Sequence, residues 1–192
     1  MNAMVRGGIV AVTAAAAVVM SACGGPSEPN PPVAPRHAES TDFARIPGQF
    51  PNPAALTTNG QEQAPVGGCA NLSGPGVNAV FKIVDCGSPD STYRIIQRVN
   101  VPAECADADR SFYHNSKATG QYTVCLDLAW DKTSCIRLGQ PVSKIACTDT
   151  TAPGDRIKPT KIILDTTTLD GCPDGGYRHT QRRFTVCTET QN

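Results

Sequence analysis

Gln121-Tyr-Thr-Val-Cys-Leu-Asp-Leu128 is the stretch of this 192-residue chain that decides its fold. Its apolar residues occupy every second position, and side chains at every second position of a β-strand share one face. The stretch therefore predicts a strand with one buried face, formed by Tyr122, Val124, Leu126 and Leu128. Its centre recurs as Arg183-Phe-Thr-Val-Cys187. This recurrence indicates that the chain carries two copies of one structural unit.

Eight cysteines repeat in the same order in the two copies. Cys69-Ala-Asn-Leu72 resembles Cys135-Ile-Arg-Leu138, and the later cysteines follow at comparable spacings. We therefore expect two tandem four-cysteine modules, residues 67–131 and residues 132–192. The cysteines of the first module are Cys69, Cys86, Cys105 and Cys125, and those of the second are Cys135, Cys147, Cys172 and Cys187.

An even number of cysteines in an exported chain predicts disulfide bonds. Four cysteines allow three connectivities, so the sequence leaves the pairing within each module open. We favour nearest neighbours, because each bond would then join two segments that a turn brings back together. Closing loops of this size stabilises a fold by roughly 3 kcal/mol per bond. The favoured pairs are Cys69–Cys86, Cys105–Cys125, Cys135–Cys147 and Cys172–Cys187.

Alternating apolar residues predict antiparallel strands in both modules. The expected strands are residues 80–85, 92–99 and 122–128 in the first module and 142–146, 161–164 and 183–188 in the second. The only helical candidate is at about residues 106–116, as a short helix or as one or two irregular turns, so a small α+β arrangement is the alternative to an all-β one. The predicted fold class is mainly β, with two tandem disulfide-stapled antiparallel modules after a signal peptide and a disordered Pro-rich tether.

Residues 1–22 have the pattern of a lipoprotein signal peptide. Arg6 precedes an uncharged run, residues 7–20, that is shorter than the roughly 20 apolar residues of a membrane-spanning helix. Ser21 and Ala22 then precede Cys23, as small residues do in a bacterial lipobox, although Met20 stands where Leu is usual. We expect Cys23 to carry palmitate-type acyl chains, and two or more chains hold a protein firmly on a membrane. The alternative is an ordinary secretory signal that is cut nearby.

The segment from residue 23 to residue 66 is predicted to be a lipid-anchored, Pro-rich tether. It contains nine of the chain's 16 prolines and no apolar run of period 2 or 3.6. Such a composition buries too little surface to offset the entropy of ordering. We expect Phe43, Ile46 and Phe50 to be solvated here, with docking on the folded domain or on a partner as the alternative.

Charge and motifs exclude several classes of function. The 17 basic and 17 acidic residues balance, and no basic patch predicts binding to nucleic acid. The cysteines lack the Cys-X-X-Cys spacing of zinc sites and of reactive dithiols. No Gly-X-Ser-X-Gly nucleophile motif is present. The sequence therefore predicts no catalytic residue, no metal ligand and no cofactor.

Two histidines and one pair of aspartates are the remaining polar candidates. His114 and His179 occupy similar places in the two modules, where they could act as general bases or metal ligands. We favour polar loop residues beside tyrosines. Asp107 and Asp109 could suggest a calcium loop, but the other ligands and the glycine of an EF-hand are missing. A solvated cluster or a helix start is the favoured interpretation.

The chain resembles the LppU family of actinobacterial lipoproteins over about residues 67–130. The resemblance depends on the lipobox at Cys23, the Pro-rich tether and the first module. Within that module it is carried by Cys86-Gly-Ser-Pro-Asp-Ser-Thr-Tyr93-Arg-Ile, by Cys105 with Phe112-Tyr113, and by Tyr122-Thr-Val-Cys125-Leu-Asp. The second module departs from the pattern in its spacing. The resemblance implies a lipid anchor and a disulfide-bonded domain, and it assigns no activity.

Three functional hypotheses follow. The first is a non-enzymatic lipoprotein, exported and anchored to the outer face of the cell membrane through Cys23, whose modules bind an envelope protein or a cell-wall component. The second is an envelope enzyme that uses His114 or His179 with a carboxylate. The third is a thiol-disulfide redox partner with one labile cysteine pair. The anchor, the paired modules and the lack of a catalytic motif favour the first.

Overall fold

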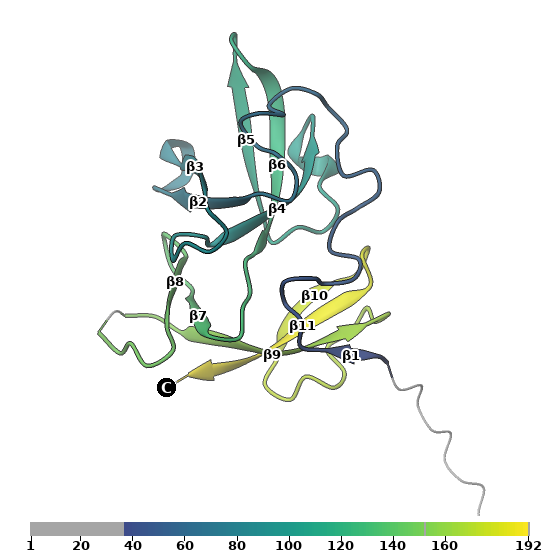
Figure 1. Cartoon of the computed structure of the whole chain (residues 1–192), viewed down its shortest axis with the longest axis vertical. Coiled ribbons are helices and arrows are strands. Elements are labelled where there is room, and N and C mark those ends of the chain that lie inside the picture. The colour runs from purple at the N-terminus through teal and green to yellow at the C-terminus, as the bar shows by residue number, and fades with distance from the viewer. Residues whose placement is uncertain (1–36, 152, 192) are drawn as a thin grey trace, which may run out of the picture. The chain divides into compact units, whose positions relative to one another are not determined.

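The computed structural model describes residues 37–151 and 153–191, and within them the chain is mainly β (Figure 1). These described residues form eleven strands and two short 3-10 helices, η1 and η2. No helix in the described part of the chain is long and apolar enough to cross a membrane. The strands make two antiparallel sheets, and the predicted fold class is confirmed. The helices are η1 (Gly76–Asn78) and η2 (Pro102–Glu104).

The first sheet is formed entirely by the first module. Its five strands lie in the order β3-β2-β4-β6-β5. The expected strands at residues 80–85, 92–99 and 122–128 correspond to β3, β4 and β6. The strands are β2 (Cys69–Ser73), β3 (Val80–Val84), β4 (Tyr93–Val99), β5 (Arg110–Ser116) and β6 (Gly120–Leu128).

The second sheet is formed by the second module and one short strand from upstream. Its main path is β10-β11-β9-β7-β8, and β1 pairs with β9 at Ile162 and Ile163. Strand β7 pairs with β9 at its other end, at Arg156 and Ile157. The chain passes from the first sheet to the second between β6 and β7. The strands are β1 (Glu39–Ser40), β7 (Ser134–Arg137), β8 (Ser143–Ala146), β9 (Arg156–Leu164), β10 (Gly176–His179) and β11 (Phe184–Gln191).

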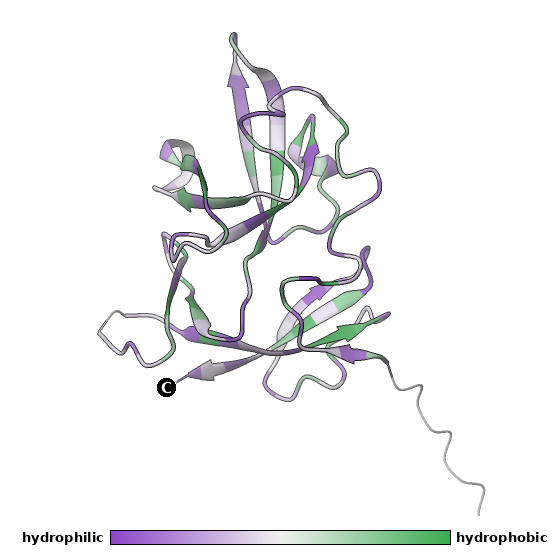
Figure 2. Ribbon diagram, in the orientation of Figure 1, coloured by the Kyte–Doolittle hydropathy of each residue, from purple (hydrophilic) through white to green (hydrophobic). Residues whose placement is uncertain are grey.

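One hydrophobic cluster contains buried residues from both sheets. The alternating face of β6 lies in it, as the sequence predicts, together with Ile162 and Phe184 of the second sheet. The opposite face of β6 is also buried, at Thr123, Cys125 and Asp127. Away from this core the β5–β6 hairpin is hydrophilic at its tip and hydrophobic toward its base (Figure 2).

The two edge strands of the first sheet approach each other through aromatic side chains. Phe81 of β3 stacks on Phe112 of β5, with ring centroids 5.1 Å apart. These strands lie at opposite ends of the strand order. The sheet is therefore strongly curled, so that its apolar face is enclosed.

All eight cysteines of the modules form disulfides, and the nearest-neighbour pairing is confirmed. The bonds Cys69–Cys86 and Cys105–Cys125 lie in the first module. The bonds Cys135–Cys147 and Cys172–Cys187 lie in the second. Each sheet thus carries two covalent links between segments that are close in sequence.

The segment from residue 37 to residue 66 packs against both sheets. Phe43 and Ile46 are 7% and 6% exposed and belong to the main core, so the expectation that they are solvated was wrong. Phe50 is 41% exposed, as expected. Gly48 lies so close to the second sheet that a Cβ atom there would meet the Arg182 carbonyl oxygen at 2.7 Å. The composition of this segment misled the prediction, because its few apolar side chains reach a core formed by distant strands and its backbone is bound by β4.

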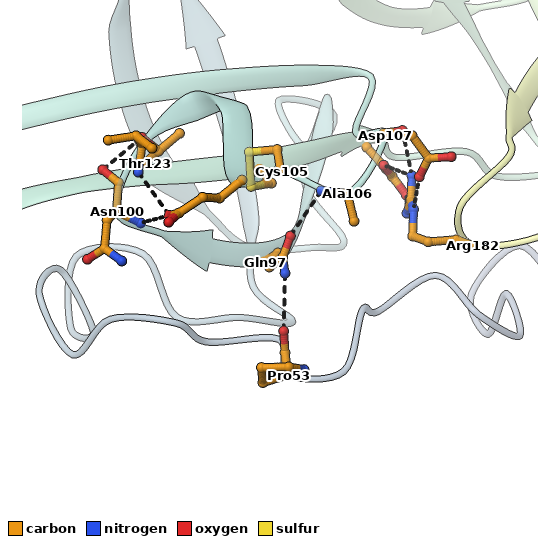
Figure 3. The surroundings of a disulfide bond; sticks show 12 residues. Pro53, Gln97, Asn100, Cys105, Ala106, Asp107, Thr123 and Arg182 are labelled. Atoms are coloured by element: carbon orange, nitrogen blue, oxygen red, sulfur yellow. Dashed lines mark hydrogen bonds and ion pairs between the residues drawn. A yellow bond between two sulfur atoms is a disulfide. The ribbon is translucent and has the colours of Figure 1, made fainter.

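Two buried side chains of β4 bind that backbone. Arg98, 4% exposed, donates to the Thr57 carbonyl at 3.0 and 3.2 Å and to the Ala64 carbonyl at 3.0 Å. The Gln97 amide donates to the Pro53 carbonyl at 3.1 Å, and its oxygen accepts from the Ala106 backbone at 3.2 Å (Figure 3). Arg98 and Gln97 both bond to main-chain groups. Every residue type supplies the same main-chain carbonyl, so these contacts leave no pattern in the sequence.

The helix expected at residues 106–116 is absent, and that prediction was wrong. Residues 110–116 form β5, which pairs with β6 along its whole length, from Arg110–Leu126 to Ser116–Gly120. Pairing with a long neighbouring strand outweighs the weak helical pattern of residues 106–109. Only the 3-10 turn η2 precedes the strand.

Candidate functional site: a cavity lined by Arg94 and Trp130

Two clusters of polar side chains lie inside the fold, and the first joins the two sheets. Arg182, in the loop between β10 and β11, donates to both carboxylate oxygens of Asp127 on β6, at 2.7 and 2.9 Å. Its Nε donates to Asp107 at 2.9 Å, beyond Cys105 in the first module (Figure 3). The Arg182 and Asp127 side chains are 3% and 2% exposed. We call Asp107, Asp109, Asp127, His179 and Arg182 the Arg182 network.

His179 and Asp109 complete this network. The Nδ1 atom of His179 lies against an Arg182 N–H and accepts from it, and Nε2 lies 3.8 Å from an Asp109 oxygen. Burial raises the pKa of Asp109 to about 6, and the nearby charge of Asp127 adds to the shift. The expectation that Asp107 and Asp109 are solvated was therefore wrong. His179, 2% exposed, lies on β10 and not in a loop.

The Arg182 network has the residue types of a metal site but not the chemistry of one. Ligand atoms of Asp109, Asp127 and His179 lie within 4.8 Å of one another. Both Asp127 oxygens, however, accept hydrogen bonds from Arg182. A buried guanidinium at this point repels a second cation and already neutralises one carboxylate. The residues fit a structural ion network that fixes one sheet on the other.

The second cluster lines a cavity of about 230 Å³, which we call the Arg94 cavity. Three parts of the chain meet there: the segment before the modules, the first sheet with the residues that follow it, and β8 of the second sheet. Phe43, Leu128 and Ala129 give it apolar walls. Its polar lining comes from Gln49, Ser91, Arg94, Trp130, Asp131, Lys144 and the Cys69–Cys86 disulfide.

Unpaired polar atoms concentrate at this cavity. Among the described residues, four buried side-chain polar atoms have no hydrogen-bond partner, and three belong to lining residues: Ser91 Oγ, Arg94 Nε and Trp130 Nε1. Ser91 and Trp130 are 1% and 6% exposed. A buried donor without an acceptor costs about 1–3 kcal/mol, and native folds contain few of them. All three atoms are shielded from solvent, so they lie buried behind the cavity surface and do not face the open space.

The two cationic side chains that line the cavity, Lys144 and Arg94, differ in whether they have an acidic partner. Lys144 pairs with Asp131 at 3.0 Å. Burial alone would raise the pKa of Asp131, but hydrogen bonds from Ser134, Lys144 and Thr133 outweigh it and hold that pKa well below its usual value. Arg94 forms no salt bridge with any described residue. Its Nη1 donates to the sulfurs of Cys86 and Cys69, at 3.5 and 3.6 Å, and its guanidinium lies over the Phe50 ring, 6.0 Å from the ring centroid.

Gln49 connects the two clusters. Gln49, 5% exposed, lines the Arg94 cavity, and its amide lies 3.4 Å from an oxygen of Asp127. Its backbone carbonyl accepts from Arg182 at 2.8 Å. The cavity wall is therefore attached to the network that joins the sheets.

The two histidines that the sequence analysis named as candidates, His114 and His179, lie in different parts of the structure. His114 lies on β5 and bonds to Thr119 at 2.9 Å, whereas His179 lies in the Arg182 network. Neither histidine lines the Arg94 cavity. Cys23, the predicted lipidation site, lies outside the described residues.

The residues of the Arg94 cavity were missed at the sequence level. Ser91 lies between a turn and β4, Arg94 lies at the start of β4, and Trp130 follows β6. One pattern could have drawn attention to Trp130, because it is the only Trp in a chain with 5% aromatic residues. Nothing in the sequence links it to Arg94 or to Lys144.

Comparisons with known proteins found no match to this chain: no family model, no curated protein and no solved structure matches it.

Proposed function

We propose that this protein is an exported lipoprotein, anchored through acyl chains on Cys23, whose folded domain binds a ligand at the outer face of the cell membrane. The observation that carries the proposal is the Arg94 cavity, in which apolar walls lie beside an arginine that has no salt bridge with any described residue. Four disulfides support export, because such bonds persist in oxidising compartments. The resemblance to the LppU lipoproteins is part of the same proposal.

The chemistry of the cavity favours binding over turnover. Arg94 and Lys144 supply cationic side chains, which suit the holding of an anionic group. The histidines, as the usual general bases, lie elsewhere, and His179 is 2% exposed with Nδ1 bonded to Arg182. The proposed role is therefore that of a non-enzymatic binding module.

A tethered domain of this kind gains from its anchor. The chain before residue 37 separates Cys23 from the first described residues, and it carries five prolines between Pro26 and Pro35. Pro-rich segments act as semi-rigid spacers. The anchor would keep the cavity close to its ligand at the envelope surface. Metabolic labelling with palmitate tests this part, since the wild type should incorporate label and Cys23→Ser should not.

Native mass spectrometry tests the binding itself. The full chain would be purified in mild detergent from its own envelope and weighed under non-denaturing conditions. We expect a bound small molecule of reproducible mass that is lost in Arg94→Gln. Arg178→Gln is the matched control, because Arg178 is an exposed arginine of β10 outside the cavity. An adduct unaffected by Arg94→Gln, or the bare protein mass in every preparation, contradicts the proposal.

A second candidate function is thiol-disulfide exchange at Cys69–Cys86. One observation favours it: the Arg94 guanidinium lies 3.5 Å from the Cys86 sulfur, in a residue that is exposed. A neighbouring cation stabilises a thiolate and so promotes exchange. This candidate predicts that Cys86 is reduced or mixed in a fraction of the native protein.

A further inference from the structure

The two sheets have the same strand order, so positions in one have counterparts in the other. Read from β8, the path of the second sheet is β8-β7-β9-β11-β10, which is the path β3-β2-β4-β6-β5 of the first with each strand number raised by five. Within the β5–β6 hairpin, Cys125 pairs with Ser111. Within the β10–β11 hairpin, Cys187 pairs with Gly176. These two cysteine pairs fix which residues correspond.

The histidines of the two hairpins are counterparts by this register. Three pairs beyond the cysteine, His114 pairs with Tyr122 in the first module. Three pairs beyond the cysteine of the second module, His179 pairs with Phe184. Each histidine ring also packs on the ring of its cross-strand partner, with centroids 4.9 and 4.4 Å apart. The two hairpins are therefore equivalent in side chains as well as in pairing.

A pair of carboxylates also recurs. Asp127 lies two residues after the cysteine of β6, and Glu189 lies two residues after the cysteine of β11. Asp109 and Asp174 each lie two residues before the residue that pairs with that cysteine. Each module thus carries two acids at the same two positions.

Only the acid pair of the first module is occupied within the described residues. It receives the end of the β10–β11 hairpin in the Arg182 network, where Arg182 donates to Asp127 at 2.7 and 2.9 Å. Asp174 and Glu189 form no salt bridge with any described residue. Asp174 is exposed, and Glu189 is half-buried and accepts from its neighbour Gln191 at 3.0 Å.

The hairpin end of the first module is free in the same sense. Lys117 is the third residue after His114, as Arg182 is the third after His179. Lys117 is exposed and forms no salt bridge within the described part of the chain. The β5–β6 hairpin projects beyond the rest of its sheet (Figure 1). One copy therefore presents a basic hairpin end and an acid pair, the same two kinds of surface that join its own modules.

We propose that copies of this protein associate head to tail, with the β5–β6 hairpin end of one copy docking on Asp174 and Glu189 of the next. The occupant is a second copy, because the two free surfaces are complementary in charge and repeat an interface that the chain already forms internally. Lys117 takes the place of Arg182 as the donor to the carboxylates. Such a contact uses two different surfaces, so it does not close after two copies.

The cation beside the free acid pair does not oppose this docking. Lys158 of β9 pairs with Glu189 in the strand register. Arg94 of β4 holds the corresponding place opposite Asp127. Arg182 nevertheless binds Asp127 at that position. The inference goes beyond the proposed binding function and does not depend on the Arg94 cavity.

Native mass spectrometry of the full chain in mild detergent tests the association, since it weighs each assembly. At concentrations up to about 1 mM, we expect dimers and longer assemblies whose share grows with concentration. Lys117→Gln and Asp174→Asn each remove one charge from opposite sides of the contact, and each should weaken association at least about tenfold. Lys82→Gln is the matched control, because Lys82 is an exposed lysine of β3 outside both surfaces. Both test positions are exposed, so the variants should fold.

Mixing the two variants distinguishes a head-to-tail contact from a symmetric one. Nitrogen-15-labelled Lys117→Gln keeps its acid pair, and unlabelled Asp174→Asn keeps its hairpin end. We expect a dimer with one copy of each and no longer assembly. A wild type that stays monomeric over the whole range overturns the proposal, and so does association that either variant leaves unchanged. Weakened association without the mixed dimer also overturns it, because the contact is then symmetric.

Discussion

Arg182 and Asp127 form a two-pronged ion pair across the two sheets, with both N–H···O bonds between 2.7 and 2.9 Å. Asp127 lies on the first sheet and Arg182 in the loop before β11 of the second, so this pair links the modules. Both side chains are at most 3% exposed. Removing one partner of such a pair leaves a buried charge without compensation.

Arg182→Ala should therefore destabilise the fold by about 3–5 kcal/mol, measured by denaturant unfolding. Asp127→Leu with Arg182→Met should cost much less than the sum of the single changes, because the buried Asp127–Arg182 pair is then removed as a whole and neither partner is left without the other. A double-mutant cycle measures this coupling. If the effects of the two substitutions simply add, the pair does not link the sheets energetically.

Asp109 should make stability fall with rising pH in the acid range. Its pKa of about 6 in the folded chain exceeds the value of about 3.9 of an unfolded Asp, so only the folded chain keeps this proton between the two. Stability from this group is present below about pH 4 and is lost as the pH rises through about 6. Asp109→Asn should flatten the dependence of unfolding free energy on pH across that window.

The control for this pH effect is Asp131. Its pKa is lowered in the folded chain, so its contribution is lost at the acid end, as the pH falls below about 4. Asp131→Asn should therefore leave the slope between about pH 4 and 6 as it is. An unchanged slope in Asp109→Asn would contradict the assignment.

Arg98 should hold the segment of residues 54–66 on the first sheet. Its guanidinium is buried and bonds only to backbone carbonyls of that segment, those of Thr57 and Ala64. Arg98→Met keeps the stem but removes these bonds, each worth about 1.5–3 kcal/mol when one group is charged. We expect faster hydrogen exchange and early proteolytic cleavage in residues 54–66, with Arg178→Met as an unaffected control. Equal protection in the two variants would contradict this role.

The two disulfides of the first module should differ in their importance. Their loops are similar, with sequence separations of 17 and 20 residues, so each contributes roughly 3 kcal/mol by restricting the unfolded chain. Cys125 is fully buried and its partner Cys105 is half-buried, whereas Cys69 is 3% exposed and its partner Cys86 is exposed. Replacing Cys105 and Cys125 by Ala should therefore lower the melting temperature more than replacing Cys69 and Cys86. Equal losses would show that burial adds nothing.

Local patterns in the sequence were sufficient for much of the fold. The alternation of Tyr122, Val124, Leu126 and Leu128 predicts the buried face of β6, and the positions of the cysteines predict the four bonds. Both features depend on neighbours within about 20 residues, where turns return the chain on itself. The strand β5 was missed because its pairing with β6 outweighs its own weak pattern.

Contacts between distant segments could not be predicted in the same way. Arg182 and Asp127 are 55 positions apart, and Arg98 binds carbonyls of the upstream segment at separations of 34 and 41. Phe43 lies in a Pro-rich stretch without periodicity, which is typical of a spacer. The Arg94 cavity combines three such distant segments. Its residues have ordinary roles one by one and form a site only when the chain is folded.

Non-reducing peptide mapping by mass spectrometry, on protein isolated from its native envelope, tests the central claim most directly. The account of an anchored binding module predicts that the mature chain begins at an acylated Cys23. It also predicts that all eight remaining cysteines are closed in the four pairs of the structure. An unacylated Cys23 would contradict the anchor. A reduced or mixed Cys69–Cys86 pair would contradict the binding role and make thiol-disulfide exchange at Arg94 the function to pursue.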